Sequence, residues 1–194
     1  MEIKKNVDLA PYTTFHLGAR AEYFSLVKNE PELISAANWA KAKRLPLNFL
    51  AGGSNIIIIK RKIKGLVIKI AGEKYSIKNN LITCWAGTGL TKLSLVAARL
   101  GLGGLEWACG IPGSIGGAVR GNAGAYGSAI SNVALAVKVY DPAKGKSVRL
   151  NNRACGFAYR GSIFKRKKSL LITEVKLRLT KGSPEKIKNL NEAN

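Results

Sequence analysis

A glycine-rich stretch between Glu106 and Tyr126 holds the residues of this chain best suited to chemistry. Glycine weakens helices and strands, so a cluster this dense indicates either a loop that must adopt φ > 0 or a backbone that lies close against a ligand. Both needs fit a glycine turn that runs into a short helix, where backbone N–H groups converge on an anion. A mobile linker is disfavoured, because apolar residues interleave with the glycines where a solvated linker would carry Ser, Lys or Glu. The glycines of the stretch are Gly110, Gly113, Gly116, Gly117, Gly121 and Gly124, with Gly104 just before it, and the apolar residues are Ile111, Ile115, Val119 and Tyr126.

Two further glycine turns accompany this stretch, Gly52-Gly53-Ser54-Asn55 and Gly87-Thr88-Gly89. Each turn follows a predicted strand or precedes a predicted helix, and together they predict a long polyphosphate ligand held by several loops. The Gly-Lys-Ser/Thr string of nucleotide-triphosphate loops is absent from the sequence. Lys92 stands where a Gly-x-Gly-x-x-Gly dinucleotide fingerprint would have its third glycine, so a Rossmann site is disfavoured.

Tyr159 and Arg160 form the other candidate for chemistry, because an arginine held beside a tyrosine can stabilise a developing oxyanion. A structural pair between Arg160 and a carboxylate is the commoner alternative and stays open. His16 is the only histidine, so a Ser-His-Asp triad or a multi-histidine metal site is hard to build, and no metal site is predicted. The cysteines are three in number and match neither a disulfide framework nor a zinc pattern. Cys109 and Cys155 have no histidine base and are interpreted as buried, reduced thiols.

The first part of the chain must supply a sheet edge for the Gly52–Asn55 turn. A strand–helix–strand unit is predicted for residues 1–71, with a helix that opens at Asn29, is capped by Glu32, and ends before Pro46. The glycine turn then lies at the carboxyl end of a strand, where ligands bind in α/β sheets. The strands expected in this unit are Ala21–Val27, Leu47–Ala51, Ile56–Ile59 and Leu66–Ile70.

A second, larger unit is predicted for residues 72–182, followed by a polar tail at residues 183–194. A helix with Thr91 as its N-cap and Gly101 as its stop should precede the long glycine-rich stretch. Alternating patterns and turn residues predict mainly strands for the rest of the unit, so the fold class expected is α+β. These strands are Tyr75–Lys78 and Leu81–Ala86 in one hairpin, Val133–Tyr140 and Ser147–Leu150 in another, and Leu170–Leu179 near the end.

The charge of the chain is unusual, with 32 Lys and Arg against 11 Asp and Glu, a net +21. A basic chain can bind nucleic acid, anionic membranes or phosphate-bearing ligands. The lysines are spread along the whole chain without an RNA-binding strand pattern, so a basic proteome or a solvated face is favoured over nucleic-acid binding. No apolar run approaches the roughly 18–20 residues of a membrane span, and the first residues lack the apolar segment of a signal peptide. We therefore expect a cytoplasmic protein without a membrane partner.

Ordered strings along almost the whole chain closely resemble the UDP-N-acetylenolpyruvoylglucosamine reductase family of flavoenzymes, also called UDP-N-acetylmuramate dehydrogenases. The resemblance implies an FAD-binding module of the p-cresol methylhydroxylase type, made of two α+β subdomains with FAD between them. The strings begin at Tyr12, Ala51, Gly104, Gly116, Tyr159 and Ile172, and read YTTFHLG, AGGSN, GLEWACGIPG, GGAVRGNAGAYG, YRGSIFK and ITEVKLRL.

The resemblance also assigns residues to the cofactor. The glycine turns would wrap the pyrophosphate of FAD, and the residues after the long stretch would lie near the flavin. The cofactor-binding residues so implied are Gly52, Gly53, Ser54, Asn55, Ile56, Gly87, Gly110, Ile111, Pro112, Gly113, Ser114, Gly116, Gly117, Asn122, Gly124, Ala125 and Tyr126.

The reaction implied by the resemblance uses NADPH to reduce the flavin, which then gives hydride to the enolpyruvyl group of a UDP-sugar in peptidoglycan precursor synthesis. Tyr159 and Arg160 would bind the substrate, and Arg160 would be the catalytic arginine that steadies the enolic intermediate. The family continues for roughly another hundred residues, a substrate domain of ordinary size that carries a serine proton donor and a late glutamate. Ser162 falls in the arginine motif and Glu174 in a strand pattern, so neither is expected to be one of these residues.

Three hypotheses follow from this comparison of motifs. The chain is an enzyme completed by a second chain or by a further C-terminal piece that supplies the substrate domain. Alternatively, it is a flavin-binding module without turnover, because the proton donor is missing. The third hypothesis is a basic nucleic-acid-binding protein that reuses the fold.

Overall fold

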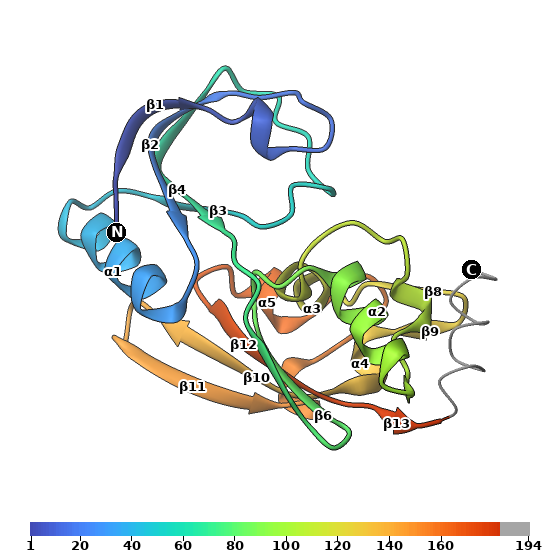
Figure 1. Cartoon of the computed structure of the whole chain (residues 1–194). Coiled ribbons are helices and arrows are strands. Elements are labelled where there is room, and N and C mark those ends of the chain that lie inside the picture. The colour runs from blue at the N-terminus through green and yellow to red at the C-terminus, as the bar shows by residue number, and fades with distance from the viewer. Residues whose placement is uncertain (183–194) are drawn as a thin grey trace. The chain divides into compact units, whose positions relative to one another are not determined.

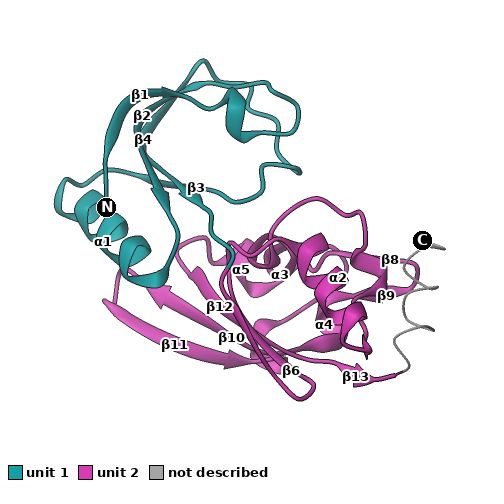
Figure 2. Ribbon diagram, viewed as in Figure 1, with its two compact units in different colours: residues 1–73 teal, residues 74–194 magenta. Residues whose placement is uncertain are grey.

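The computed structural model describes residues 1–182 of the chain. It divides into two compact units, unit 1 up to Glu73 and unit 2 from Lys74 onward (Figures 1 and 2). The polar tail predicted for residues 183–194 lies outside the described residues. Each unit has a sheet of its own with helices packed against it, and the class is therefore α+β.

Unit 1 is built on a four-stranded sheet in the order β1-β2-β4-β3. β1 runs antiparallel to β2, whereas β2 and β3 both run parallel to β4, which lies between them. The chain therefore crosses from β2 through helix α1 to the edge strand β3, and only then returns to fill the central position. The elements are β1 (Lys4–Asp8), β2 (Arg20–Val27), α1 (Glu30–Ala42), β3 (Leu47–Leu50) and β4 (Lys62–Ile70), with a short 3₁₀ turn at Ala10–Tyr12.

Helix α1 begins where its capping residues predict. The Asn29 side chain accepts a hydrogen bond from the Glu32 N–H at 3.0 Å, and the Glu32 carboxylate accepts from the Lys28 N–H at 2.7 Å. This reciprocal arrangement satisfies backbone donors that the first turn of a helix leaves without partners. The inner face of α1 is made largely of alanines, which lets its backbone approach β2 and β4 closely. Its buried residues are Leu33, Ala36, Ala37 and Ala40.

The run Ile56–Ile59 does not form the strand that its composition predicts. In unit 1 the edge strands of the sheet are β1 and β3, and these isoleucines pair with neither of them. Ile58 alone packs against the core cluster of Leu9, Ala21, Phe24, Leu50 and Val67. Ile57 and Ile59 are 64% and 90% exposed.

Unit 2 contains a five-stranded antiparallel sheet in the order β11-β10-β12-β6-β5. Two hairpins, β5–β6 and β10–β11, are joined by β12, which pairs with β10 on one side and β6 on the other. Buried residues alternate with more exposed ones along most of β6 and the second half of β12. Figure 1 shows helices α2 and α3 on one side of this sheet. The strands are β5 (Tyr75–Lys78), β6 (Leu81–Trp85), β10 (Ala134–Asp141), β11 (Lys146–Asn151) and β12 (Leu171–Arg178).

In the part of unit 2 that the structure describes, up to residue 182, four helices connect or cover these strands. Both predicted hairpins and the late strand are confirmed. Two small sheets lie beside them, formed by β7 with β13 and by β8 with β9. The helices are α2 (Leu90–Arg99), α3 (Ile115–Gly121), α4 (Ile130–Val133) and α5 (Ile163–Arg166). The short strands are β7 (Leu102–Gly103), β8 (Gly124–Ala125), β9 (Ser128–Ala129) and β13 (Thr180–Lys181), and 3₁₀ turns lie at Glu106–Ala108 and Arg153–Cys155.

The start of α2 differs from the prediction. Gly89 is the N-cap and Leu90 the first helical residue, whereas Thr91 was expected to cap the helix. The Thr91 hydroxyl instead donates to the Ile111 carbonyl at 2.8 Å. The hydroxyl is used to fasten α2 to the long glycine-rich stretch, a long-range contact that no local pattern indicates. Within residues 1–182, no helix is both long enough and apolar enough to cross a membrane.

Candidate functional site

The Gly52–Asn55 turn of unit 1 follows the end of β3 directly. Gly53 is buried with φ of 74°, and its carbonyl accepts a hydrogen bond from the Thr14 N–H at 3.1 Å. A β-carbon at this position would lie 2.2 Å from the Tyr12 carbonyl oxygen, so only glycine fits. Gly52, Asn55 and Ile56 are exposed on this loop. The turn thus lies at the carboxyl end of parallel strands, the position at which α/β sheets bind ligands.

The two glycine segments of unit 2 lie side by side. Gly89 and Ser114 form an antiparallel bridge, which is extended when the Ile115 N–H donates to the Thr88 carbonyl at 2.8 Å. The Gly116 N–H donates to the Ala86 carbonyl at 2.9 Å, and a β-carbon on Gly116 would lie 2.8 Å from the Ala86 β-carbon. Glycine at position 116 is therefore required for this close packing. The Gly87–Gly89 turn and the Gly110–Gly117 segment form one surface.

Part of this surface is open to a ligand. Gly110 has φ of 76°, is exposed, and has no atom within 4 Å of the position where a β-carbon would stand. Pro112 and Gly117 are exposed too, while Ile111 and Gly113 are half-buried. Ser114 caps α3 by accepting a hydrogen bond from the Gly117 N–H at 3.2 Å. The segment is therefore a shaped loop that enters a short helix, as the glycine spacing predicts.

Of the residues expected near the flavin, Gly124, Ala125 and Tyr126 lie in a hairpin, and Asn122 lies at the end of α3. Gly124 and Ala125 form β8, which pairs with β9 across a tight turn. Tyr126 occupies that turn with φ of 50° and is 69% exposed. Asn122 ends α3 in the left-handed conformation with φ of 44°.

Tyr159 and Arg160 form the tip of another tight turn. Ala158 and Gly161 exchange backbone hydrogen bonds of 3.0 and 3.1 Å, and Arg160 has φ of 50°. The carbon of the Arg160 guanidinium lies 5.9 Å from the centre of the Tyr159 ring, and Tyr159 is 93% exposed. Arg160 is thus held on a raised turn with its cation beside an aromatic ring.

Two side chains fasten this turn, Asn122 at the end of α3 and Lys165 in α5, and the sequence pattern predicts neither contact. The Asn122 amide donates to the Ala158 carbonyl at 2.9 Å, and its oxygen accepts from the Ser131 N–H at 3.2 Å. The Lys165 ammonium donates to the Arg160 carbonyl at 2.9 Å. The Asn122 side chain, expected at the cofactor, is engaged in orienting the Tyr159–Arg160 turn.

We expect the variant Asn122→Asp to loosen this turn. Aspartate still tolerates the left-handed conformation and still accepts from Ser131, but it cannot donate to the Ala158 carbonyl. The hydrogen bond is exposed, and its loss lowers the free energy of unfolding by about 0.5–1.5 kcal/mol. Urea unfolding measures this effect, with Asn132→Asp as a second amide-to-acid change on the exposed side of α4. If the two variants unfold at the same urea concentration, the Asn122 amide does not fasten the turn.

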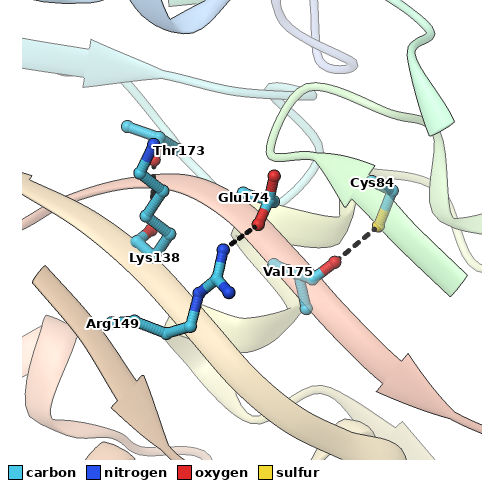
Figure 3. Close-up of polar contacts among 6 residues, drawn as sticks. All are labelled: Cys84, Lys138, Arg149, Thr173, Glu174 and Val175. Atoms are coloured by element: carbon cyan, nitrogen blue, oxygen red, sulfur yellow. Dashed lines mark hydrogen bonds and ion pairs between the residues drawn. The ribbon is translucent and has the colours of Figure 1, made fainter. Parts of the chain in front are cut away.

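Ser162 and Glu174 are both unavailable for proton transfer. Ser162 is fully buried, and its hydroxyl donates to the Arg120 carbonyl at 2.7 Å. Glu174 pairs with Arg149 across the sheet at 2.9 Å, as Figure 3 shows. Among the described residues, these two side chains therefore do not act as the serine acid or the late glutamate.

Cys84 and Cys155 are structural rather than nucleophilic. Burial, reinforced by the Glu174 carboxylate, raises the pKa of the Cys84 thiol to about 12, and this thiol donates to the Val175 carbonyl at 3.5 Å (Figure 3). Burial raises the pKa of Cys155 to about 11. Cys109 is only half-buried, so the expectation that it is a buried thiol is wrong. No cluster of His, Cys, Asp and Glu within residues 1–182 could hold a metal ion.

These thiol pKa values predict a loss of stability in alkali. Above pH 9 the unfolded thiols lose their protons while the folded ones keep them, so the unfolded state binds fewer protons and stability falls as the pH rises from about 9 to 12. The cost at pH 10 is about 1 kcal/mol for each thiol. Urea midpoints at pH 8 and pH 10 for the wild type and for Cys84→Ala measure it. An equal pH dependence in both proteins would contradict the prediction for Cys84.

The chain is similar to known proteins that bind FAD or are named as reductases. The family model described as an FAD binding domain matches residues 21–151. The chain is 34% identical to the UDP-N-acetylenolpyruvoylglucosamine reductase of Prochlorococcus marinus (strain NATL2A), over 100% of this chain and 67% of the relative. It is 33% identical to the enzyme of the same name from Synechococcus sp. (strain RCC307), over 94% of this chain and 60% of the relative. The chain thus spans about 60% of the length of this curated relative.

Solved structures give the same result. The crystal structure of UDP-N-acetylenolpyruvylglucosamine reductase from Thermus caldophilus matches with a TM-score of 0.82 and 31% identity, over 100% of this chain and 68% of that one. A 6-hydroxy-D-nicotine oxidase from Arthrobacter nicotinovorans matches with a TM-score of 0.67 at 18% identity, over 93% of this chain and 42% of that one, which shows a shared fold alone. The expected α+β module of the p-cresol methylhydroxylase type is confirmed.

Proposed function

We propose, since this chain belongs to the UDP-N-acetylenolpyruvoylglucosamine reductase family of FAD-binding proteins, that it binds FAD and serves the NADPH-dependent reduction of UDP-N-acetylglucosamine enolpyruvate to UDP-N-acetylmuramate. The reaction would belong to peptidoglycan precursor synthesis in the cytoplasm. The observation that carries the proposal is the pair of glycine segments bridged at Gly89 and Ser114, with Gly110 open beside them.

The residues present fit the diphosphate of FAD. In unit 1 the Gly52–Asn55 turn stands at the carboxyl end of a parallel strand, and in unit 2 the Gly110–Gly117 segment enters α3. Backbone N–H groups in such turns bind anions without a charged side chain. In unit 2 this role would fall to the loop before Ile115, because the N–H groups of Ile115, Gly116 and Gly117 already donate within the protein. Only glycine fits at positions 53 and 116, because a β-carbon there would clash with Tyr12 or Ala86, so the sequence maintains the backbone path of both loops. In this proposal Ile56 extends the loop of unit 1, and Gly87, Ala125 and Tyr126 extend the loops of unit 2.

The chain's own part in the chemistry would fall to Arg160. Bound FAD supplies hydride transfer from NADPH to the substrate. The Arg160 guanidinium, fixed on its turn, would bind the substrate beside Tyr159 and stabilise negative charge that develops as the enolpyruvyl group is reduced. The proton that completes the reaction would come from residues outside the described part of the chain, which leaves room for a second chain as donor.

A second candidate function is FAD binding without turnover. It is favoured by one observation: Ser162 is buried and hydrogen-bonded, and Glu174 is paired with Arg149. If nothing else supplies a proton, the chain would bind flavin and accept hydride from NADPH, yet fail to pass it on.

Spectroscopy and stopped-flow kinetics test the proposal. Purified protein mixed with FAD should show a shifted flavin absorption band, and NADPH should bleach it under anaerobic conditions. Reoxidation by the enolpyruvyl UDP-sugar supports full turnover, whereas bleaching without reoxidation supports the second candidate. Absence of any flavin binding would overturn both. Titration with single-stranded RNA at two salt concentrations tests the nucleic-acid alternative, since such binding weakens steeply with salt.

A further inference from the structure

We infer that Lys69 is a ligand-binding residue of unit 1, whose ammonium holds the Gly52–Asn55 turn in place and provides the positive charge for a diphosphate bound there. The inference rests on the proposed binding of FAD, and it adds a charged side chain to a site that glycine turns alone describe. Nothing in the glycine pattern of the sequence indicates this residue.

The register of the sheet places Lys69 beside the turn. Leu50 of β3 is paired with Lys69 of β4 in the parallel ladder, and Ala51, the next residue of the β3 chain, precedes the glycines. The Lys69 ammonium donates a hydrogen bond to the Ala51 carbonyl. Lys69 therefore reaches from the central strand of the sheet to the last residue before the loop. This is the carboxyl end of the parallel strands, where the sheet geometry favours a ligand.

The electrostatics of Lys69 are unusual for a lysine of this chain. Its side chain is half-buried, and this burial lowers the pKa of the ammonium. The ammonium donates its hydrogen bond to the neutral Ala51 carbonyl, and no carboxylate in the described part of the chain forms an ion pair with it. A partly desolvated charge without a counter-ion is costly. A bound anion would offset that cost, and a lysine next to a turn of backbone N–H groups is a recurring way to hold phosphates.

Other basic residues of unit 1 do not have this placement. Lys62 lies on the same strand as Lys69 but at its first residue, and it is exposed. Water and salt screen a charge in such a position. Lys62 is therefore a matched control: Lys62→Met and Lys69→Met remove the same charge from opposite ends of β4.

The chemical class of the ligand decides the experiment. FAD and ADP both carry a diphosphate, whereas riboflavin carries no phosphate. Calorimetric titration of the full chain with each of the three measures whether Lys69 serves the diphosphate. We expect Lys69→Met to lower the affinity for FAD and for ADP by about 10–100-fold, the range for loss of a hydrogen bond to a charged group. Riboflavin affinity should be unchanged, Lys69→Arg should restore most of the loss, and Lys62→Met should bind all three as the wild type does.

The outcomes separate this inference from the proposed function. FAD and ADP binding that is unchanged in Lys69→Met overturns the inference and leaves the flavin proposal standing. Equal weakening of riboflavin, FAD and ADP also overturns it, because Lys69 would then only maintain the loop. If the wild type binds ADP but not FAD, and Lys69→Met no longer binds ADP, the inferred diphosphate site is supported and the proposal of flavin binding is overturned. If the wild type binds neither FAD nor ADP, both proposals fall.

Discussion

The variant Gly53→Ala should lower the free energy of unfolding of unit 1 by about 3–4 kcal/mol, at the upper end of what single substitutions cause. Two effects add at this position. Alanine in the left-handed region costs about 1–2 kcal/mol, and its β-carbon would stand 2.2 Å from the Tyr12 carbonyl oxygen. The Tyr12 carbonyl cannot move away freely, because the chain is held two residues later, where the Thr14 N–H donates a hydrogen bond to the Gly53 carbonyl.

Gly145 offers the matched control for this experiment. It has φ of 64° in the turn between β10 and β11, and no atom lies within 4 Å of its β-carbon position. Gly145→Ala should therefore show only the conformational cost, about 1–2 kcal/mol. Urea unfolding followed by tryptophan fluorescence, with Trp39 in unit 1 and the other tryptophans in unit 2, measures both variants. Equal destabilisation by the two substitutions would mean that the loop can yield, and that close packing at Gly53 is not what requires glycine.

The variant Arg160→Met should lower kcat for reduction of the enolpyruvyl UDP-sugar by about 10²–10³-fold, the usual effect of removing one group that stabilises a developing negative charge. FAD affinity and the rate of flavin reduction by NADPH should be unchanged, because neither step needs charge stabilisation on the sugar nucleotide. Arg160→Lys should recover little of the loss, since a lysine keeps the charge but not the planar fork of donors. Steady-state kinetics measures kcat and KM separately, with the chain alone if it turns over, or with the chain completed by its substrate domain.

Two controls sharpen the Arg160 experiment. Arg153→Met removes an exposed cation from a neighbouring 3₁₀ turn and should leave kcat unchanged. Tyr159→Phe removes only the hydroxyl and keeps the ring that the guanidinium lies over. If Arg160→Met changes KM alone and leaves kcat intact, the arginine binds the substrate without assisting its reduction, and the proposed catalytic role is wrong.

Local chemistry made much of unit 2 and the helix of unit 1 predictable. Asn29 and Glu32 fix the start of α1 through contacts only three residues apart. The hairpin β5–β6 follows from a two-residue turn in which Asn79 adopts φ of 56°, a conformation that asparagine tolerates. These features depend on neighbours in sequence, so the sequence pattern contains them.

Long-range pairing explains the wrong predictions. Ile56–Ile59 has the composition of a buried strand, but β2 and β3 occupy both sides of β4, and the run pairs with neither edge strand, β1 or β3. β1 was missed for the opposite reason: its exposed Lys4 and Lys5 suit an edge strand and give no apolar alternation. Thr91 has the chemistry of an N-cap, yet a carbonyl twenty residues away takes its hydroxyl.

The candidate site shows the same division. The glycine turns could be predicted because glycine is needed for the backbone path itself. The roles of Asn122 and Lys69 could not, because each depends on a carbonyl that the fold brings near, Ala158 in one case and Ala51 in the other. Neither asparagine nor lysine carries a local pattern that distinguishes such a contact from exposure to solvent.

During synthesis, β12 emerges last of the five strands, although it stands at the centre of their sheet. Hairpins β5–β6 and β10–β11 must remain separate on the nascent chain until it arrives. Translation at about 5–20 residues per second makes that interval on the order of ten seconds after β6 is complete. Unit 1 has all its strands within residues 1–73 and can close earlier. The Ala86 N–H, just before the Gly87–Gly89 turn, donates to the Thr173 carbonyl of β12 at 2.9 Å. The end of β6, from which the Gly87–Gly89 turn begins, therefore gains this contact only once β12 has been made.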